Sequence, residues 1–317
     1  MEIDSRSKDR RILIVGTGAL ATLFAWRLAG AGSEVTLLGS WQAGLRTLRT
    51  EGARLVDARG TESTVRVHVA EDPEACRDAQ RAIVLVKSWQ TARAAAQLVE
   101  CLAPDGLALT LQNGLGNYEI LAEALGADRV ALGTTTAGAT LLGPGLVKPA
   151  GNGSVSIQSH ARLGQLPSLF ESGGFRVNLV GNAEALLWGK LVVNSAINPL
   201  TALLRVPNGE LLSRPTARAL MRALAVETAA VAEANKVELS MGDPAAFVEN
   251  VARETASNYS SMLQDIQRGA PTEIDAICGA IVRTARQRGL PAPLNEACWQ
   301  LVTALTRASG EMVRVAG

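Results

Sequence analysis

The sequence predicts an α/β domain built on a parallel sheet, followed by an all-helical domain. In the first half, short apolar runs alternate with helical patterns, which is the rhythm of parallel strands joined by crossover helices. From about residue 183 this alternation stops and long helical patterns replace it. The length of 317 residues also exceeds what one typical core needs. We therefore predict two domains, 1–181 and 182–317, with the boundary near Gly181.

Apolar runs mark the strands expected in the first domain. The turn-rich segment Pro149–Gly153 separates two of them, 145–148 and 154–158, and this arrangement predicts a hairpin at the sheet edge. The remaining expected strands are 12–15, 35–38, 83–86, 107–111, 130–133 and 175–180, with helices over 19–29 and 91–102.

The second domain is expected to contain helices separated by Pro and Gly residues. Thr272 precedes one helical pattern and is expected to cap it. The expected helices are 183–205, 215–236, 244–258, 272–288 and 294–308.

Composition excludes several classes of protein. The formal net charge of +1, with acidic and basic residues interspersed, argues against nucleic acid as a partner. The chain has no apolar run of the ~18 residues that a membrane span needs, and its polar start, 1–11, lacks a signal-peptide core. The sequence therefore predicts a protein without a membrane or nucleic-acid partner.

Cysteine and histidine usage points the same way. The four cysteines lie far apart without a CxxC pair, which predicts free, buried thiols in a reducing compartment. With only two histidines, a histidine-based metal site or a Ser-His-Asp triad has little material. We expect a cytoplasmic enzyme or binding protein without a bound metal.

A glycine-rich turn directly follows the first predicted strand and opens the first predicted helix. Its sequence, Gly16-Thr17-Gly18-Ala19-Leu20-Ala21, has the G-x-G-x-x-A spacing. The first glycine permits the tight turn, the second lets the backbone approach a pyrophosphate, and the small Ala21 permits close packing of helix on strand. The helix N-terminus adds free N–H groups and partial positive charge. We therefore expect a Rossmann-type dinucleotide-binding domain rather than an empty glycine turn.

The second predicted strand bears on the choice of cofactor. Sites for NAD(H) usually carry Asp or Glu at the end of this strand, to hold the adenosine ribose. Here the strand ends in Leu38-Gly39-Ser40, without a carboxylate. This absence favours NADP(H), whose 2′-phosphate an acid would repel. Because no arginine stands at the strand end, although Arg46 follows soon after, NAD(H) stays an alternative.

Polar residues also follow two later strands. Lys87 and Ser88 come after one, and Gln112, Asn113 and Gly114 come after the next. Ligands of open parallel sheets bind outside the carboxyl ends of the strands. A solvated lysine and an ordinary turn would explain each pattern singly, but their shared position beside the glycine loop favours binding of the cofactor.

A narrow polar stripe interrupts an otherwise apolar helical segment in the second half. Lys190, Asn194 and Asn198 are spaced i, i+4 and i+8, so they share one helix face. Desolvation on an apolar helix lowers the pKa of a lysine, and a general acid near neutral pH needs that shift. The amides could orient a polar substrate. A solvent-facing stripe is the alternative, although surface helices usually carry a wider charged face.

Two later segments carry complementary polar groups. Ser260 and Ser261 present hydroxyls suited to a carboxylate or hydroxyl ligand. Glu273 and Asp275 stand in the first turn of a predicted helix, where helix electrostatics alone would favour acids. From the residues alone, capping and catalysis are equally good explanations of Glu273.

Together these segments resemble the ketopantoate reductase family over nearly the whole chain, from Ile12 to about Arg307. The ordered C-terminal signatures are more specific than the glycine loop. The matching segments are Gly16–Ala21, Leu85–Gln90, Gln112–Gly116, Gly133–Thr136, Trp188–Leu191, Asn194, Ile197–Ala202, Pro207–Leu211, Ser260–Ile266 and Thr272–Asp275.

The resemblance implies NADPH-dependent reduction of 2-dehydropantoate to (R)-pantoate, a step toward pantothenate and coenzyme A. It implies that Lys190 protonates the developing alkoxide as a general acid. It also implies that Glu273 binds the distal hydroxyl of the substrate and shapes the site beside the cofactor. The other implied positions are Asn113, Asn194, Asn198 and Ser261 for the substrate or nicotinamide ribose, and Lys87 on the cofactor side.

The sequence departs from the family at one position and leaves alternatives open. Family members commonly have arginine at the end of the second strand, where this chain has Ser40. The same two-domain plan could serve a paralogous reductase of another 2-oxoacid, or a β-hydroxyacid or opine-type dehydrogenase. A redox sensor that binds NADP(H) without turnover is a further alternative. The apolar helical domain is also compatible with a homodimer.

Overall fold

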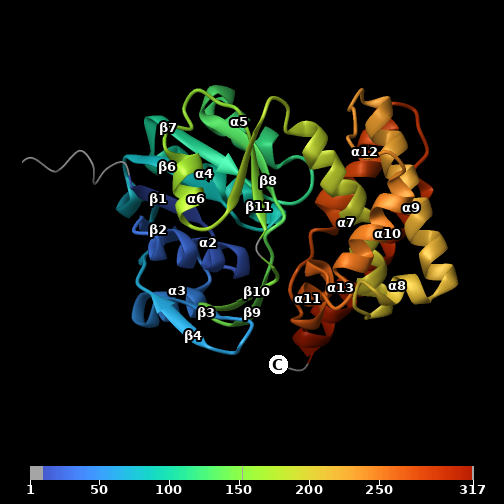
Figure 1. Cartoon of the computed structure of the whole chain (residues 1–317), viewed down its shortest axis with the longest axis horizontal. Coiled ribbons are helices and arrows are strands. Elements are labelled where there is room, and N and C mark those ends of the chain that lie inside the picture. Colours follow the sequence, from blue (N-terminus) through green and yellow to red (C-terminus); the bar gives the residue numbers. More distant parts are fainter. Residues whose placement is uncertain (1–9, 152, 316–317) are drawn as a thin grey trace, which may run out of the picture. The chain divides into compact units, whose positions relative to one another are not determined.

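The computed structural model describes residues 10–151 and 153–315, with side chains described as far as residue 306. The chain forms two compact units (Figure 1). The first holds the chain up to Gln112 together with Asn117–Ala183, and the second holds Asn113–Gly116 together with the chain from Glu184 onward. The expected fold class, a Rossmann-type α/β domain followed by a helical domain, is confirmed.

An eight-stranded sheet forms the centre of the first unit. Its strand order is β12-β11-β8-β7-β6-β1-β2-β5, and each neighbouring pair is parallel except β11 with β8. The strands are β1 (Arg11–Val15), β2 (Glu34–Leu38), β5 (His68–Ala70), β6 (Ala79–Val84), β7 (Leu102–Thr110), β8 (Val130–Thr135), β11 (Ser154–Gln158) and β12 (Arg176–Val180).

Helices cover both faces of this sheet, which explains why its central strands are continuous apolar runs. Along β1, Ile12 and Ile14 pack in the same cluster as buried residues of α2. Leu13 and Val15 point to the other face, in a cluster with buried residues of α4 and α5. The α-helices of this unit are α2 (Ala19–Gly30), α3 (Gln42–Glu51), α4 (Thr91–Cys101), α5 (Asn117–Leu125) and α6 (Leu166–Ser172).

A second, four-stranded sheet was not predicted. Its order is β4-β3-β10-β9, formed by β3 (Ala53–Val56), β4 (Glu62–Val65), β9 (Ala139–Gly143) and β10 (Leu146–Pro149). The hairpin expected around Pro149–Gly153 is therefore wrong. Strand β10 pairs with β3 and β9, whereas β11 pairs with β8 and β12. Turn residues mark where the chain changes direction, but they do not choose the partner of either flanking strand.

The second unit is helical and has its own core. Its helices are α7 (Glu184–Leu204), α8 (Glu210–Ser213), α9 (Pro215–Ala234), α10 (Pro244–Glu254), α11 (Ser261–Gln267), the π-helix η4 (Asp275–Gly279), α12 (Ala280–Gln287) and α13 (Pro293–Val315). Buried apolar side chains of α7, α9, α10, η4 and α13 form one cluster. The predicted helix 272–288 begins only at Ile274, so Thr272 is not its N-cap.

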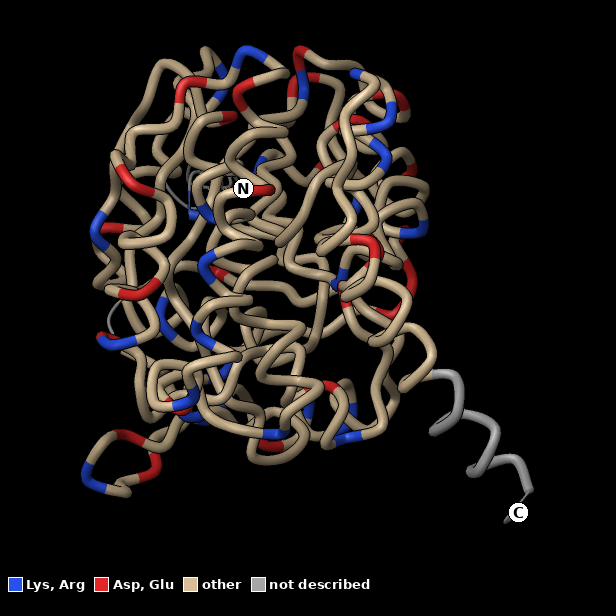
Figure 2. Tube along the Cα trace, turned by 90° about the vertical axis from the view of Figure 1, so that its right-hand side faces the viewer, with Lys and Arg blue, Asp and Glu red and all other residues tan. Residues whose placement is uncertain are grey.

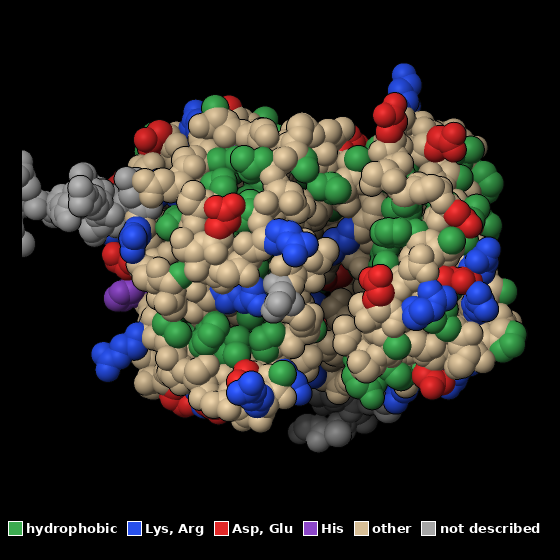
Figure 3. Space-filling view, viewed as in Figure 1, with side chains coloured by type: hydrophobic (Ala, Val, Ile, Leu, Met, Phe, Trp, Pro, Cys, Tyr) green, Lys and Arg blue, Asp and Glu red, His purple; other side chains and the backbone are tan. Residues whose placement is uncertain are grey.

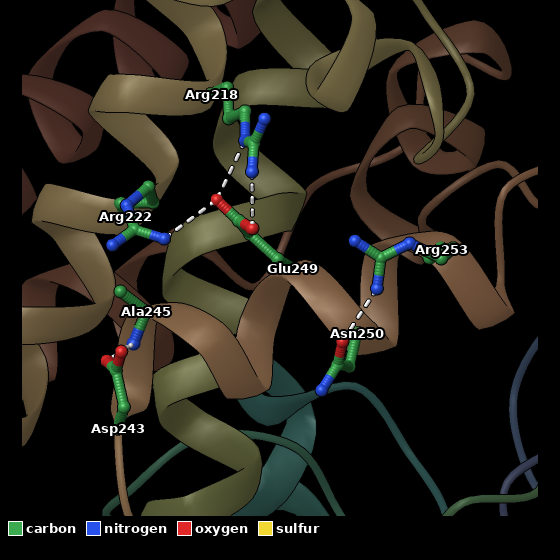
Figure 4. Close-up of polar contacts among 7 residues, drawn as sticks. All are labelled: Arg218, Arg222, Asp243, Ala245, Glu249, Asn250 and Arg253. Atoms are coloured by element: carbon green, nitrogen blue, oxygen red, sulfur yellow. Dashed lines mark hydrogen bonds and ion pairs between the residues drawn. The ribbon is translucent and has the colours of Figure 1, made fainter.

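A buried carboxylate ties α9 to α10. Glu249 of α10 is 6% exposed and accepts two hydrogen bonds from Arg218 and one from Arg222, at 2.8–2.9 Å (Figure 4). These bonds hold the pKa of Glu249 down at about 2. The cluster fixes two helices through charge-assisted hydrogen bonds.

Charged residues of both signs are interspersed along the chain (Figure 2) and over the face of each unit that Figure 3 shows. Among the described residues, no helix is long and apolar enough to cross a membrane. In the same residues, no three His, Cys, Asp or Glu side chains gather as metal ligands.

Candidate active site

The glycine loop lies at the carboxyl end of β1. Gly16 has φ +132°, and a Cβ on it would lie 3.1 Å from the backbone carbon and oxygen of Leu85. Its N–H donates to the carbonyl of Leu38 at 2.8 Å. Ala21 is fully buried. The loop thus needs glycine for both its conformation and its close approach to Leu85, just after β6.

The N-terminus of α2 is left open by the protein. Gly18 is its N-cap residue, no side chain caps it, and its first turn holds no acid. A Cβ on Gly18 would meet no described atom within 4 Å. Free N–H groups and the positive end of the helix dipole therefore face uncovered space. This arrangement fits a bound pyrophosphate, as expected for residues 16–21.

The end of β2 is held close to this loop. An ideal Cβ on Gly39 would lie 2.7 Å from Cγ2 of Thr17, so the backbone passes tightly against the loop. The next residue, Ser40, accepts a hydrogen bond of 2.7 Å from Nη1 of Arg93 in α4. Arg93 is not predictable as a partner of Ser40 from local sequence, because 53 residues separate the two and no local motif connects them.

The strand-end residues Lys87 and Gln112 have different surroundings. Lys87 is half-buried and precedes the 3-10 turn η2 (Ser88–Gln90). The buried Gln112 donates to the carbonyl of Val86 at 3.0 Å and to Oγ1 of Thr91 at 2.8 Å. Gln112 therefore fixes the end of β6 to the start of α4, whereas Lys87 keeps its predicted place at a strand end.

The short segment Asn113–Gly116 belongs to the second unit, although it directly follows β7 and Gln112. Nδ2 of Asn113 donates to Oε2 of Glu273 at 3.1 Å, and the N–H of Leu115 donates to the carbonyl of Ala276 at 3.0 Å. Gly114 has φ +83°, and a Cβ on it would lie 2.4 Å from that carbonyl oxygen. The segment is thus fitted against the π-helix η4, and it brings Asn113 to Glu273.

The predicted polar stripe lies on α7. Lys190 and Asn194 are half-buried, and Asn198 is 7% exposed. Burial lowers the pKa of Lys190 to about 8, and the charge of Glu273 acts in the opposite direction. Glu273 itself is 5% exposed. A lysine on α7 and a carboxylate just before η4 thus interact in a largely buried setting, which is typical of functional sites.

The two serines before α11 divide into different environments. Ser260 is buried and caps α11, accepting from the N–H of Leu263 at 3.1 Å and from Oγ1 of Thr201 at 2.7 Å. Ser261 is exposed at the first position of α11. Only Ser261 of this pair is thus accessible to a ligand.

A buried polar chain supports α7 from behind the stripe. Ser195 is fully buried, and its hydroxyl lies 2.9 Å from that of Thr228 in α9. Nδ2 of Asn295 donates to the hydroxyl of Thr228 at 3.2 Å and to Oε1 of Glu227 at 2.9 Å. These bonds link α7, α9 and α13, so Ser195 has a structural role although it adjoins Asn194 in sequence.

Comparisons with known proteins agree over both units. Residues 12–162 match the family model described as "Ketopantoate reductase PanE/ApbA", and residues 182–306 match that described as "Ketopantoate reductase PanE/ApbA C terminal". A curated relative from Halobacterium salinarum, named 2-dehydropantoate 2-reductase, is 39% identical over 299 residues, which cover 92% of this chain and 97% of the relative.

Solved structures give the same result. A PanE/ApbA family ketopantoate reductase from Ralstonia eutropha JMP134 is 32% identical, with a TM-score of 0.87, covering 95% of this chain and 99% of that one. A D-mandelate dehydrogenase, solved with NADH and anilino(oxo)acetate, is 28% identical, with a TM-score of 0.89 and the same coverage.

Proposed function

This chain belongs to the ketopantoate reductase family, and from that premise we propose that it reduces 2-dehydropantoate to (R)-pantoate with NADPH. The product is a precursor of pantothenate and coenzyme A. The observation that carries this proposal is Lys190, whose pKa of about 8 places its proton loss close to physiological pH. A lysine of this kind beside a buried carboxylate suits proton transfer to a carbonyl oxygen.

Reduction of the 2-oxo group adds a hydride to carbon and a proton to oxygen. When bound, the reduced nicotinamide supplies the hydride. The Lys190 ammonium donates a hydrogen bond to the carbonyl oxygen and transfers its proton as negative charge develops there. The lysine is left as a neutral amine, the form that its desolvated position favours.

Other polar side chains of the second unit would hold the substrate. The amides of Asn194 and Asn198, on the same face of α7 as Lys190, offer hydrogen-bond donors to the carboxylate of the substrate. The Glu273 carboxylate would accept a hydrogen bond from the distal hydroxyl, and its bond from Asn113 holds it in one orientation. The exposed hydroxyl of Ser261 adds a further donor.

The first unit would hold the cofactor. The open N-terminus of α2 and the loop 16–21 suit its pyrophosphate, and Lys87, which follows the neighbouring strand β6, would lie on the nicotinamide side. The end of β2 carries Ser40 instead of a carboxylate, which supports NADPH over NADH.

Initial rates with both cofactors test this proposal. The protein should oxidise NADPH in the presence of 2-dehydropantoate, and the rate at low cofactor concentration should exceed that with NADH. A panel of other 2-oxoacids, including phenylglyoxylate, serves as the control for substrate. A higher kcat/KM for another 2-oxoacid would contradict the proposed substrate.

The similarity to D-mandelate dehydrogenase favours one alternative, a reductase of bulkier 2-oxoacids that uses NADH. The absence of arginine at the end of β2 is compatible with it. Higher rates with phenylglyoxylate and NADH would establish this alternative. Binding of NADPH without oxidation by any 2-oxoacid would instead indicate a sensor. A sensor does not need Lys190, Asn194, Asn198 and Glu273 together.

We also propose a cytoplasmic homodimer. The four cysteines are buried and unpaired, which supports a reducing compartment. The second unit exposes large apolar side chains, among them Val226, Phe247 and Leu301 at 51%, 40% and 56%. Covering such side chains against a second copy would remove apolar surface from water. Light scattering across a concentration series should give twice the mass of the chain, and a constant single-chain mass would contradict the dimer.

A further inference from the structure

The end of β2 has no charged residue of its own, but a hydrogen bond brings the positively charged Arg93 to it. Nη1 of Arg93 donates to Oγ of Ser40 at 2.7 Å. We propose that Arg93 and Ser40 together bind the 2′-phosphate of NADPH, and that Arg93 sets the preference for NADPH over NADH. This inference rests on the proposed function for the identity of the cofactor.

The sheet order places this pair beside the glycine loop. Strand β1 lies between β2 and β6, and all three are parallel. Ser40 comes two residues after β2, and Arg93 stands in the first turn of α4, which follows β6. The bond between them therefore passes over the carboxyl end of β1, where Gly16 begins the loop. In this fold the adenosine ribose lies on the β2 side of that loop.

The chemistry of the pair suits a phosphate. A guanidinium has five N–H donors in a planar fork, and the bond to Ser40 uses one of them. Ser40 accepts that bond, so its own hydroxyl hydrogen can be donated to a phosphate oxygen. Arg93 is exposed and Ser40 is half-buried, so a ligand can reach both. Charge-assisted bonds of this kind are about twice as strong as neutral ones.

Arg93 is held by a well-anchored helix start. Thr91, the first residue of α4, is fully buried and accepts a hydrogen bond from Gln112 at 2.8 Å. Ala94 and Ala95 are buried against the sheet. Arg93 thus extends from a fixed backbone toward solvent, and it lies on the exposed face of α4.

The acid nearest in sequence to the neighbouring strand end does not neutralise Arg93. Glu71 follows β5, the neighbour of β2, and its carboxylate accepts from Gln42 at 2.9 Å and from Arg49 at 3.1 Å. This acid is therefore already compensated. Among the described contacts of Arg93, the bond to the neutral Ser40 leaves its positive charge uncompensated, so an anion can add to it.

Calorimetric binding of two nucleotides tests the inference without catalysis. Adenosine 2′,5′-bisphosphate and adenosine 5′-monophosphate differ only by the 2′-phosphate. The natural protein should bind the bisphosphate more tightly. Arg93→Ala should weaken bisphosphate binding by about 10- to 100-fold and leave the monophosphate unchanged, which corresponds to about one or two charge-assisted hydrogen bonds. Arg46→Ala, a nearby exposed arginine on α3, is the matched control and should change neither.

Two further variants separate recognition from a structural role. Ser40→Asp should abolish the preference for the 2′-phosphate through repulsion while it keeps monophosphate binding. If Arg93 only fastened α4 to β2, Arg93→Ala would weaken both nucleotides equally and lower the melting temperature, and this would overturn the inference. An unchanged bisphosphate affinity would overturn it too.

The two proposals can fail separately. If Arg93→Ala loses the 2′-phosphate preference but the natural protein does not reduce 2-dehydropantoate, the proposed substrate is wrong and the role of Arg93 stands. If the natural protein reduces 2-dehydropantoate with NADPH and Arg93→Ala keeps the same NADPH to NADH ratio, the role of Arg93 is wrong and the proposed function stands.

Discussion

Two clusters in the helical unit combine opposite charges: Lys190 with Glu273, and Glu249 with Arg218 and Arg222. In both clusters a pKa is lowered, but that of Lys190 moves toward neutral pH and that of Glu249 moves away from it. In the pair Lys190 and Glu273, loss of water around the lysine outweighs attraction by the carboxylate, so the pKa of Lys190 falls to about 8. In the Glu249 cluster, hydrogen bonds from two arginines outweigh desolvation, so the pKa of Glu249 falls to about 2. The first shift brings a proton within reach of physiological pH, whereas the second fixes a charge.

A shifted pKa alone therefore does not mark a catalytic group, because it occurs in both clusters. The clusters differ in how many charged hydrogen-bond donors surround the buried group. Glu249 receives three hydrogen bonds from arginines that are 48% and 44% exposed, and its negative charge is satisfied. Lys190 lies on an apolar helix, where burial disfavours its charged form.

The largest effect should follow from Lys190→Ala. Removal of the general acid should lower kcat by ~10²–10⁴-fold, with little change in nucleotide binding. Lys148→Ala, an exposed lysine on β10, is the control and should keep the natural rate. Steady-state rates with 2-dehydropantoate provide the measurement. Near-natural turnover in Lys190→Ala would mean that the Lys190 and Glu273 pair, like the Glu249 cluster, is not catalytic.

The pH dependence should follow the pKa of Lys190. As a general acid it must be protonated, so kcat/KM for reduction should fall about tenfold per pH unit above about 8. Glu249 stays ionised throughout this range and should contribute nothing to the profile. Stopped-flow or initial-rate measurements across neutral and alkaline pH provide the check. A rate that stays constant through pH 8 to 10 would contradict the assignment of the acid.

Gly114→Ala should disturb the Lys190 and Glu273 pair indirectly, through the neighbouring Asn113. The new Cβ would meet the carbonyl oxygen of Ala276, and alanine also disfavours a positive φ, so the variant should lose about 1–3 kcal/mol of stability. Its shifted backbone should also displace Asn113 from Glu273 and raise the KM for substrate.

Gly116→Ala is the matched control for this change, because Gly116 has a similar φ of +92° with no described atom within 4 Å of an added Cβ. The difference in melting temperature and KM between the variants isolates the contact with Ala276. Equal effects of both substitutions would mean that backbone conformation alone matters.

The smallest effect on activity should come from Glu249→Gln. A neutral amide would replace the carboxylate that accepts three hydrogen bonds from arginines. The free energy of unfolding should therefore fall by about 1–3 kcal/mol, while kcat stays close to that of the natural protein. The folded pKa is lowered, so the stabilisation by Glu249 is complete above pH 4.5 and disappears as pH falls toward about 2. Urea unfolding at pH 7 and at pH 3 should show this loss, with the exposed Glu254→Gln as control. A large loss of kcat would place Glu249 in the catalytic machinery.

Sequence patterns predicted the parts of the fold that depend on burial. The apolar runs of β1, β2 and β7 are buried on both faces, and long amphipathic patterns predicted α7 and α9. The second sheet escaped prediction because its strands are short and because β4 is mostly polar, with Glu62, Ser63 and Thr64 before Val65. β3 pairs locally with β4, but its other partner is β10, where Leu146 lies opposite Arg54, 92 positions earlier in the chain.

The candidate site was predicted where its residues share one element. Lys190, Asn194 and Asn198 share α7, so helical spacing alone grouped them. The bonds from Asn113 to Glu273 and from Arg93 to Ser40 join residues 160 and 53 positions apart, and only the tertiary fold brings these partners together. The π-helix after Glu273 also lacks a local signal, because its residues form an ordinary helical pattern.

The burial of the native cysteines makes this chain convenient for labelling. All four thiols are buried, and desolvation raises the pKa of Cys101 to about 12 and that of Cys298 to about 11, so little reactive thiolate forms at neutral pH. A maleimide dye should therefore not react with the native cysteines. A single cysteine introduced in the exposed β3–β4 turn, for example by Arg59→Cys, would carry the fluorophore alone, and none of the four native cysteines would have to be removed first.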